Sequence, residues 1–176
     1  MKITNLSKAA RWTIVLILLS TSTWSLALTS DREQSIKIQA DAAVVDDNSG
    51  VTVYSGNVII NQGTLHISAD EVRVIMNERE ILQIIASMQP QSSALAHYEQ
   101  MPDDDEELVS ADAKMITYFL QEERLHLAGE AFLKQTQDTF SGDLLHYDLA
   151  KGIVDLKGGN IDTGGRVNIT LTPKSN

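Results

Sequence analysis

The sequence predicts an all-β protein, built as a stack of antiparallel hairpins or as an open β-jellyroll. Apolar and polar residues alternate with a period of two along many short segments, which is the pattern of strands with one apolar face. Polar or glycine-containing turns separate these segments. A step from a small residue to aspartate also recurs along the chain, and repetition at roughly 30 residues is typical of stacked structural units.

The first 27 residues have the features of a cleaved secretory signal peptide. Three basic residues precede the apolar run 12–19, and a small-x-small cleavage site follows at 25–27. The alternative is an uncleaved membrane anchor, but the run is well below the ~20 apolar residues that span a bilayer. We therefore expect cleavage after Ala27, and a mature periplasmic or secreted domain at 28–176.

The composition argues against several classes of function. Removal of residues 1–27 takes away three of the 14 Lys and Arg residues and none of the 24 Asp and Glu residues, so the formal charge falls from −10 to −13. Such an acidic surface argues against a nucleic-acid partner and against simple adhesion to an anionic membrane. The chain has no cysteine, so an exported domain must be held together by burial and strand pairing.

The first half of the mature chain begins with a strand predicted at 36–41, where apolar residues alternate with polar ones. The polar run 46–50 is a strong turn signal. The chain then enters the hairpin 54–74, in which two alternating segments flank a turn at Gly63. A further turn is predicted at Asp70-Glu71, before the next strand.

The middle of the chain is less regular. A strand is predicted at 81–88, and Pro90 stops it. The stretch 91–109 shows no clear period and contains the acidic run Asp103 to Glu107. Calcium prefers oxygen ligands. However, the run lacks the alternating acidic positions, the central glycine and the distal glutamate of a calcium loop, so a solvated loop is the favoured interpretation.

The second half of the chain again shows short segments of alternating apolar and polar residues. Polar turns separate a further series of predicted strands, and each strand has one apolar face. These strands lie at 110–120, 125–135, 141–149 and 153–156. A last strand places Val167, Ile169 and Leu171 on one side, and Pro173 ends it.

The step from a small residue to aspartate occurs four times and defines the repeat. It is predicted to open a strand at each of Ala40-Asp41, Ala69-Asp70, Ala111-Asp112 and Gly142-Asp143. An aspartate can turn the chain through hydrogen bonds to nearby backbone groups. A glycine follows three of the four steps, at Gly56, Gly129 and Gly158, where it would mark a bulge or a close approach. Both features are interpreted as structural.

The residues offer no catalytic site. The four histidines His66, His97, His126 and His146 are scattered, and all but His97 lie opposite the apolar positions of their own strands, so those three are predicted to face solvent. The sequence has no phosphate-binding loop, no nucleophile elbow and no histidine-glutamate pair at helical spacing. We therefore expect no enzyme activity, no cofactor and no metal site.

The shared apolar face is the remaining candidate for a working surface. In an ordinary sandwich, this face would simply pack against the opposite sheet. Only 5% of the residues are aromatic, however, so the face could instead line a groove for an acyl chain. Burying ten methylene groups at about 0.8 kcal/mol each would contribute on the order of 8 kcal/mol before ordering costs. Both interpretations remain open at this point.

Two parts of the sequence carry a family resemblance. The first half contains the string SGNVIINQGTLHISADEVRV (55–74), preceded by the pattern Asp-x-x-Gln-x-Ile-x-Ile-x-x-Asp at 31–41. The second half contains LAGEAFLKQ (127–135) and SGDLLHYDLAKG (141–152). Together and in this order, these motifs resemble the LptA, or OstA-like, family of periplasmic lipopolysaccharide-transport bridge proteins, over essentially the whole mature chain.

The resemblance implies a twisted open β-jellyroll whose interior binds the acyl chains of lipid A. It also implies an interior aromatic side chain close to Pro90. This sequence departs from that pattern, because Gln91-Ser92-Ser93 stand there, and Leu95 or Tyr98 would take the interior position. The lipid-lining residues would be Ile36, Ile38, Tyr54, Val58, Ile60, Leu65, Ile67, Val72, Val74, Ile116, Tyr118, Leu125, Leu127, Leu133, Leu145 and Tyr147.

The resemblance further implies edge-to-edge pairing, in which the N-terminal strand of one subunit joins the C-terminal strand of the next. The joining residues would be Ile36, Ile38, Val167, Ile169 and Leu171. Such a head-to-tail homo-oligomer would connect an inner-membrane Lpt complex (LptC-like) to an outer-membrane translocon (LptD-like) for outer-membrane assembly. Energy would come from an ATPase elsewhere in the system.

Two other interpretations stay open. The chain could be a structural or assembly module of the cell envelope that uses its strand edges and binds no lipid. It could also be a membrane-anchored relative in the same pathway, if the N-terminal segment were retained.

Overall fold

The computed structural model describes residues 31–78, 80–102, 107–159 and 165–173. The predicted signal peptide and residues 103–106 of the acidic run lie outside these ranges. Within them, a short 3-10 helix η1 (Asp31–Glu33) precedes one sheet of twelve strands. The strands are β1 (Lys37–Gln39), β2 (Ala42–Asp46), β3 (Val51–Gln62), β4 (Leu65–Asn77), β5 (Glu80–Ser87), β6 (Ala96–Gln100), β7 (Val109–Ala113), β8 (Met115–Phe119), β9 (Arg124–Gln135), β10 (Asp138–Asp148), β11 (Ile153–Lys157) and β12 (Asn168–Thr170).

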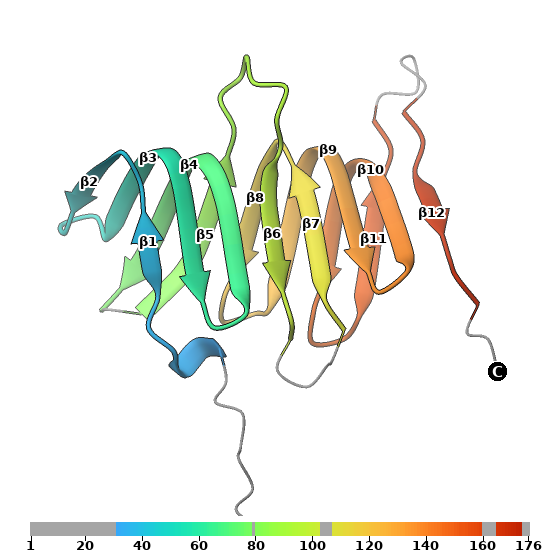
Figure 1. Cartoon of the computed structure of the whole chain (residues 1–176), viewed down its shortest axis with the longest axis horizontal. Coiled ribbons are helices and arrows are strands. Elements are labelled where there is room, and N and C mark those ends of the chain that lie inside the picture. Colours follow the sequence, from blue (N-terminus) through green and yellow to red (C-terminus); the bar gives the residue numbers. More distant parts are fainter. Residues whose placement is uncertain (1–30, 79, 103–106, 160–164, 174–176) are drawn as a thin grey trace, which may run out of the picture.

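The four long strands bend, and this folds the single sheet into two facing layers. The first half of β3 pairs with β2, whereas its second half pairs with β1. The other three long strands also change partner at their bends. The first half of β4 pairs with β6 and its second half with β5. The first half of β9 pairs with β8 and its second half with β7, and the first half of β10 pairs with β12 and its second half with β11. One layer therefore contains β1, β6, β7 and β12, and the other contains β2, β5, β8 and β11. Figure 1 looks through the first layer onto the second. The predicted twisted open β-jellyroll is confirmed.

The bend in β3 explains the first glycine of the sequence repeat. The register between β3 and β4 shifts between Ser55 and Val58, and Gly56 has a φ of 79°. The Asp41 N–H donates to the Gly56 carbonyl at 2.9 Å, and the Asn57 Nδ2 donates to Asp41 Oδ2 at 2.9 Å. A Cβ on residue 56 would lie 2.3 Å from Asp41 Oδ2. Glycine is therefore required both by its backbone conformation and by the contact.

The bend in β9 repeats this arrangement. Gly129 has a φ of 74°, and its carbonyl accepts a hydrogen bond from the Lys114 N–H at 2.8 Å. Lys114 stands between β7 and β8, as Asp41 stands between β1 and β2. The Lys114 ammonium group also lies 3.6 Å from the Glu130 carboxylate and donates to the Ser92 carbonyl at 3.0 Å. At Gly56 and Gly129, the repeat in the sequence is thus a repeat of layer-to-layer bends, whereas Gly158 follows the end of β11.

Three of the four aspartate steps do not open strands, and the turn predicted at Asp70-Glu71 is wrong. β4 runs without interruption through Asp70, Asp112 lies inside β7, and Asp143 lies inside β10. At the bend of β4, the Asp70 carboxylate accepts a hydrogen bond from the Gln89 N–H at 3.0 Å. The side chain therefore satisfies a backbone donor of the adjacent crossover, and the main chain continues as a strand.

Other element boundaries also differ from the prediction. The region predicted as one strand at 36–41 is β1, with a break at Ala40 before β2 begins at Ala42. The region 110–120 is divided into β7 and β8 at Lys114. The stretch 91–109 contains β6, which pairs with both β4 and β7. Its strand character is hidden in the sequence because the inward residue Gln100 is polar.

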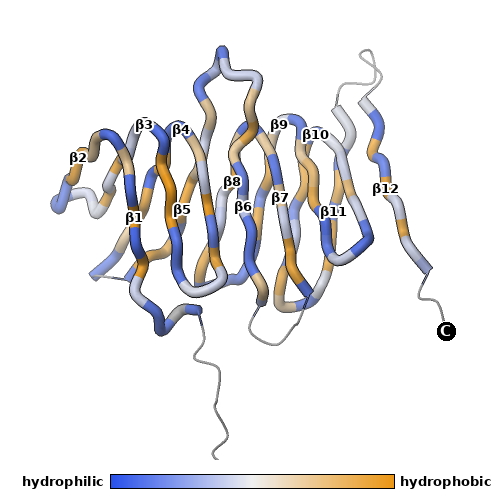
Figure 2. The backbone as a smooth tube through the Cα atoms, in the orientation of Figure 1, coloured by the Kyte–Doolittle hydropathy of each residue, from blue (hydrophilic) through white to orange (hydrophobic). Residues whose placement is uncertain are grey.

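The apolar core lies between the layers and is unsealed at both ends. The inward residues of the central strands are buried, and Figure 2 shows hydrophobic positions distributed along these strands. In contrast, every residue of β2 and of β12 is exposed. No helix among the described residues is long and apolar enough to cross a membrane.

Candidate functional site

The proposed lipid-lining residues all belong to the interior of the jellyroll. Ile36, Ile38 and Tyr54 are half-buried and pack against the core from its N-terminal end. All the others are buried in the central part of the core. The period-two pattern therefore identified the inward face of β3, β4, β8, β9 and β10.

The central part of this interior is filled with side chains. Ile60, Leu127 and Leu133 each have 0% exposed surface, and they belong to one continuous apolar cluster. A ligand in this region would therefore have to separate the layers. The interior becomes accessible toward the ends, where Phe140 and Leu156 are only partly buried.

Several interior residues were not predicted. Ile84 and Ala86 of β5 are 1% exposed, but the run of apolar residues in 81–88 gives no alternation that would identify their face. Pairing with β4 provides the missing signal, because Ile84 lies opposite Val74 and Ala86 opposite Val72. The register of a neighbouring strand thus defines which residues of an ambiguous strand point inward.

Of the two candidates that follow Pro90, Tyr98 is the one that lies in the interior. Its ring is 0% exposed and packs edge-on against Tyr118, with 5.5 Å between the ring centroids. Burial raises the pKa of Tyr98 well above its ordinary value, so its hydroxyl stays protonated. Leu95, the other candidate, is half-buried beside Val58 and Met88, in a shallow pocket near the bend of β3.

A cavity of about 330 Å³ lies where the two layers approach each other near the N-terminal end. It joins the segment before β1 to the opposite layer. Its lining residues are Gln34, Ile36, Gln62, Glu80, Ile81, Leu120 and Gln121. The apolar side chains among them extend the core surface into the cavity, so an acyl chain could contact the core here without first separating the central strands.

The predicted joining edges are free strand edges within the described structure. β1 pairs only with β3, and β12 pairs only with β10. Val167, Ile169 and Leu171 are 42%, 52% and 65% exposed, respectively. The sequence did not identify the corresponding edges of the second layer, β2 and β11. Val45 of β2 lies opposite the inward Thr52 and is 64% exposed, so apolar surface is available at this edge too.

The histidines lie on outer faces but are not scattered in space. The His126 and His146 rings stack with their centroids 4.1 Å apart, and the His66 and His97 rings lie 6.3 Å apart. Burial, followed by the proximity of His146 and Arg124, lowers the pKa of His126. Among the residues that the structure describes, no three His, Asp or Glu side chains could together hold a metal ion.

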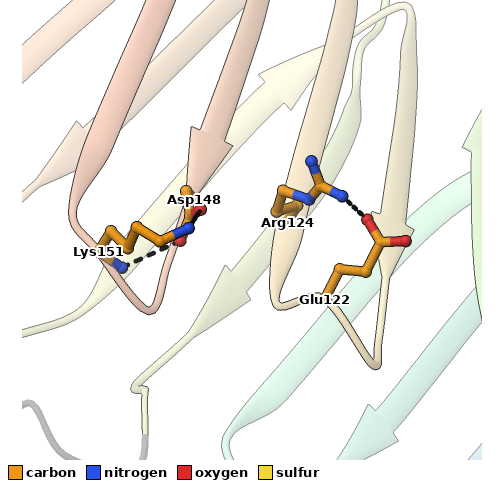
Figure 3. A network of polar contacts seen from close by, with 4 residues as sticks. All are labelled: Glu122, Arg124, Asp148 and Lys151. Atoms are coloured by element: carbon orange, nitrogen blue, oxygen red, sulfur yellow. Dashed lines mark hydrogen bonds and ion pairs between the residues drawn. The ribbon is translucent and has the colours of Figure 1, made fainter.

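Polar contacts at the turns of the second layer stabilise local structure. Lys151 pairs at 2.8 Å with Asp148, the last residue of β10, and Glu122 pairs with Arg124, the first residue of β9 (Figure 3). The hydrogen bond from Lys151 lowers the pKa of Asp148. Because the Lys151, Arg124 and Glu122 side chains are exposed to solvent, each pair contributes little to global stability.

Comparison with known proteins agrees with this architecture. The family model described as LptA/(LptD N-terminal domain) LPS transport protein matches residues 37–153. The lipopolysaccharide export system protein LptH of Pseudomonas aeruginosa is 35% identical over 134 residues, covering 76% of this chain and 74% of the relative. The lipopolysaccharide export system protein LptA of Escherichia coli K12 is 30% identical over 156 residues, covering 89% of this chain and 80% of the relative.

A solved structure shows the same fold. The crystal structure of LptH, described as the LptA homologous periplasmic component of the conserved lipopolysaccharide transport device from Pseudomonas aeruginosa, matches with a TM-score of 0.69. The match has 30% sequence identity and covers 82% of this chain and 99% of that chain. The chain belongs to the LptA and LptD N-terminal domain family of lipopolysaccharide transport proteins.

Proposed function

We propose that this protein binds lipopolysaccharide in the periplasm and transports it toward the outer membrane, without catalysing a reaction. The acyl chains of lipid A lie between the two layers, where the inward side chains named above shield them from water. The observation that carries this proposal is the continuous apolar interior, which is unsealed at both ends of the jellyroll. Residues 1–27 act as the cleaved signal peptide that directs export.

Head-to-tail pairing extends this interior from one subunit to the next. The N-terminal end presents β1 and β2, and the C-terminal end presents β11 and β12, so an edge of each layer is available at both ends. Exposed apolar side chains such as Val45 and Ile169 become covered when the ends meet. An oligomer of this kind bridges an LptC-like inner-membrane partner and an LptD-like outer-membrane partner.

The packed centre of the interior favours a second candidate function. Because Ile60 and Leu127 are completely buried by other side chains, the fold does not need a ligand to cover its core. A β-strand scaffold of the cell envelope that assembles through its edges, with no lipid, is also consistent with this packing. The two functions differ in whether lipopolysaccharide stabilises the folded chain.

Thermal unfolding in the presence of lipopolysaccharide separates these functions. A ligand that binds only the folded state, at a free concentration of about 100 times its Kd, stabilises that state by about 2.7 kcal/mol. For a domain of this size, we expect the Tm to rise by roughly 5 to 10 °C. An unchanged Tm, with filaments still forming, would support the scaffold instead. Lipopolysaccharide stripped of its acyl chains is the control and should leave the Tm unchanged.

A further inference from the structure

The segment before β1, residues 31–36, is attached to the jellyroll by a specific polar network. In Figure 1, η1 lies at the same edge of the molecule as the turn between β3 and β4. Asp31 is only 5% exposed although it stands at the beginning of the described chain. A carboxylate buried at such a position must be held by strong hydrogen bonds.

Two parts of the first layer supply these hydrogen bonds. The Thr64 N–H donates to Asp31 Oδ1 at 2.7 Å, and the Thr64 hydroxyl donates to Asp31 Oδ2 at 2.5 Å. The Gln100 Nε2 of β6 donates to Asp31 Oδ2 at 3.1 Å. A Cβ on residue 63 would lie 1.8 Å from Asp31 Oδ1, so the turn accepts this carboxylate only because Gly63 has no side chain.

The network continues into the proposed lipid path. The Tyr98 hydroxyl donates to Gln100 Oε1 at 2.5 Å, and the Tyr98 ring is fully buried between the layers. Gln100 thus uses one side-chain amide to contact both the interior tyrosine and the carboxylate of Asp31. A displacement of the Tyr98 ring therefore changes the position of a donor to Asp31.

The other end of the segment lies at the cavity and at the joining edge. The Gln62 Nε2 donates to the Gln34 carbonyl at 3.0 Å. Ile36 lines the cavity together with Ile81 and Leu120 of the opposite layer, and β1 follows immediately. The attachment of residues 31–36 thus determines both the access to this cavity and the position of the edge strand.

We propose that residues 31–36 form a clasp that an acyl chain releases when it enters the interior beside Tyr98. This inference rests on the proposed lipid-binding function. The entering chain moves the Tyr98 ring and Gln100, and Asp31 then loses a donor that its buried carboxylate requires. The segment detaches, the cavity opens, and β1 becomes more mobile as the cargo is loaded. Because such coupling is reciprocal, loosening the clasp strengthens acyl-chain binding.

Hydrogen exchange in the ligand-free protein tests the connection between Tyr98 and the clasp. Tyr98→Phe keeps the buried ring and removes the hydroxyl. We expect amide exchange over residues 31–39 to become at least about fivefold faster, as in local opening of a weakly held segment. The matched control is Tyr147→Phe, which changes another buried tyrosine, in β10, and should leave this segment at the wild-type rate. Wild-type exchange over 31–39 in Tyr98→Phe would overturn the clasp.

Binding of lipopolysaccharide tests the release step. Asp31→Asn is expected to bind lipopolysaccharide at least about fivefold more tightly than the wild type. A factor of about five is at the lower end of the change in affinity that coupling between two sites typically produces. Asp46→Asn changes an exposed turn carboxylate and serves as the control. Unchanged or weaker binding by Asp31→Asn overturns release by the acyl chain. If the wild-type protein does not bind lipopolysaccharide at all, both the proposed function and the release of the clasp by an acyl chain are overturned. The hydrogen-exchange data would still decide whether Tyr98 holds the clasp.

Discussion

Replacing Leu127 with alanine is expected to lower the free energy of unfolding by about 2–5 kcal/mol. The Leu127 side chain is completely buried in β9, where it lies opposite Ile116 of β8 and Leu145 of β10. The substitution removes apolar contacts and leaves a cavity that the paired strands cannot collapse to fill. Urea denaturation followed by circular dichroism measures the change.

The control for this substitution is another leucine. Leu171 follows β12 and is 65% exposed. For Leu171→Ala, we therefore expect the free energy of unfolding to change by no more than about 0.5 kcal/mol. Equal effects of the two substitutions would contradict the packed interior. They would favour an open groove in which Leu127 is already in contact with water.

Ile38→Asp is expected to weaken head-to-tail self-association by about a hundredfold. Ile38 lies in the middle of β1, opposite Ile60, and its half-buried side chain belongs to the apolar surface at the N-terminal end. In the assembled state, the neighbouring subunit would cover an unpaired carboxylate, which costs several kcal/mol. In the free subunit, the same carboxylate can remain hydrated. Light scattering over a concentration series measures the association.

Gln39→Asp provides the matched control for the edge. Gln39 is the next residue of β1, but its side chain is exposed and alternates to the outer face. The Gln39→Asp substitution introduces the same charge at the same edge as Ile38→Asp. Because this charge stays exposed to solvent, we expect less than a threefold change in the association constant. If the two variants associate equally well, the subunits do not join through the inward face of this end.

Much of this fold can be predicted from the sequence where one face is buried and the other is not. The hairpin at 54–74 is an example, because the inward Val58 and Ile60 alternate with the outward positions Asn57, Ile59 and Asn61, and Gly63 marks the turn. Similar alternation identified the inward residues of β9 and β10. In these strands, the local pattern and the tertiary environment impose the same period.

The prediction was less successful where the local pattern does not indicate the tertiary arrangement. β6 was missed because its inward Gln100 is polar, and that residue is needed to hold Asp31. The turn at Asp70 was wrong because aspartate beside a small residue favours a turn locally, whereas here its carboxylate binds the Gln89 N–H and the strand continues. Neither partner lies near enough in the sequence to give a local signal.

The division of the long strands between two layers also required the structure. Gly56 and Gly129 indicate bulges, but only the pairing shows that each half of a bent strand joins a different layer. The same pairing shows that, among the described strands, β2 and β11 are also edge strands. An interface predicted from the terminal strands alone therefore included only one of the two layers.

Photo-crosslinking to lipopolysaccharide tests whether acyl chains lie between the two layers. A photoreactive residue would be placed at the buried Val58 or Leu133, or at the half-buried Ile36, and compared with one at His66 on the outer face. We expect crosslinked lipopolysaccharide from the three inward positions and little from His66. Crosslinking from His66 alone would contradict this expectation.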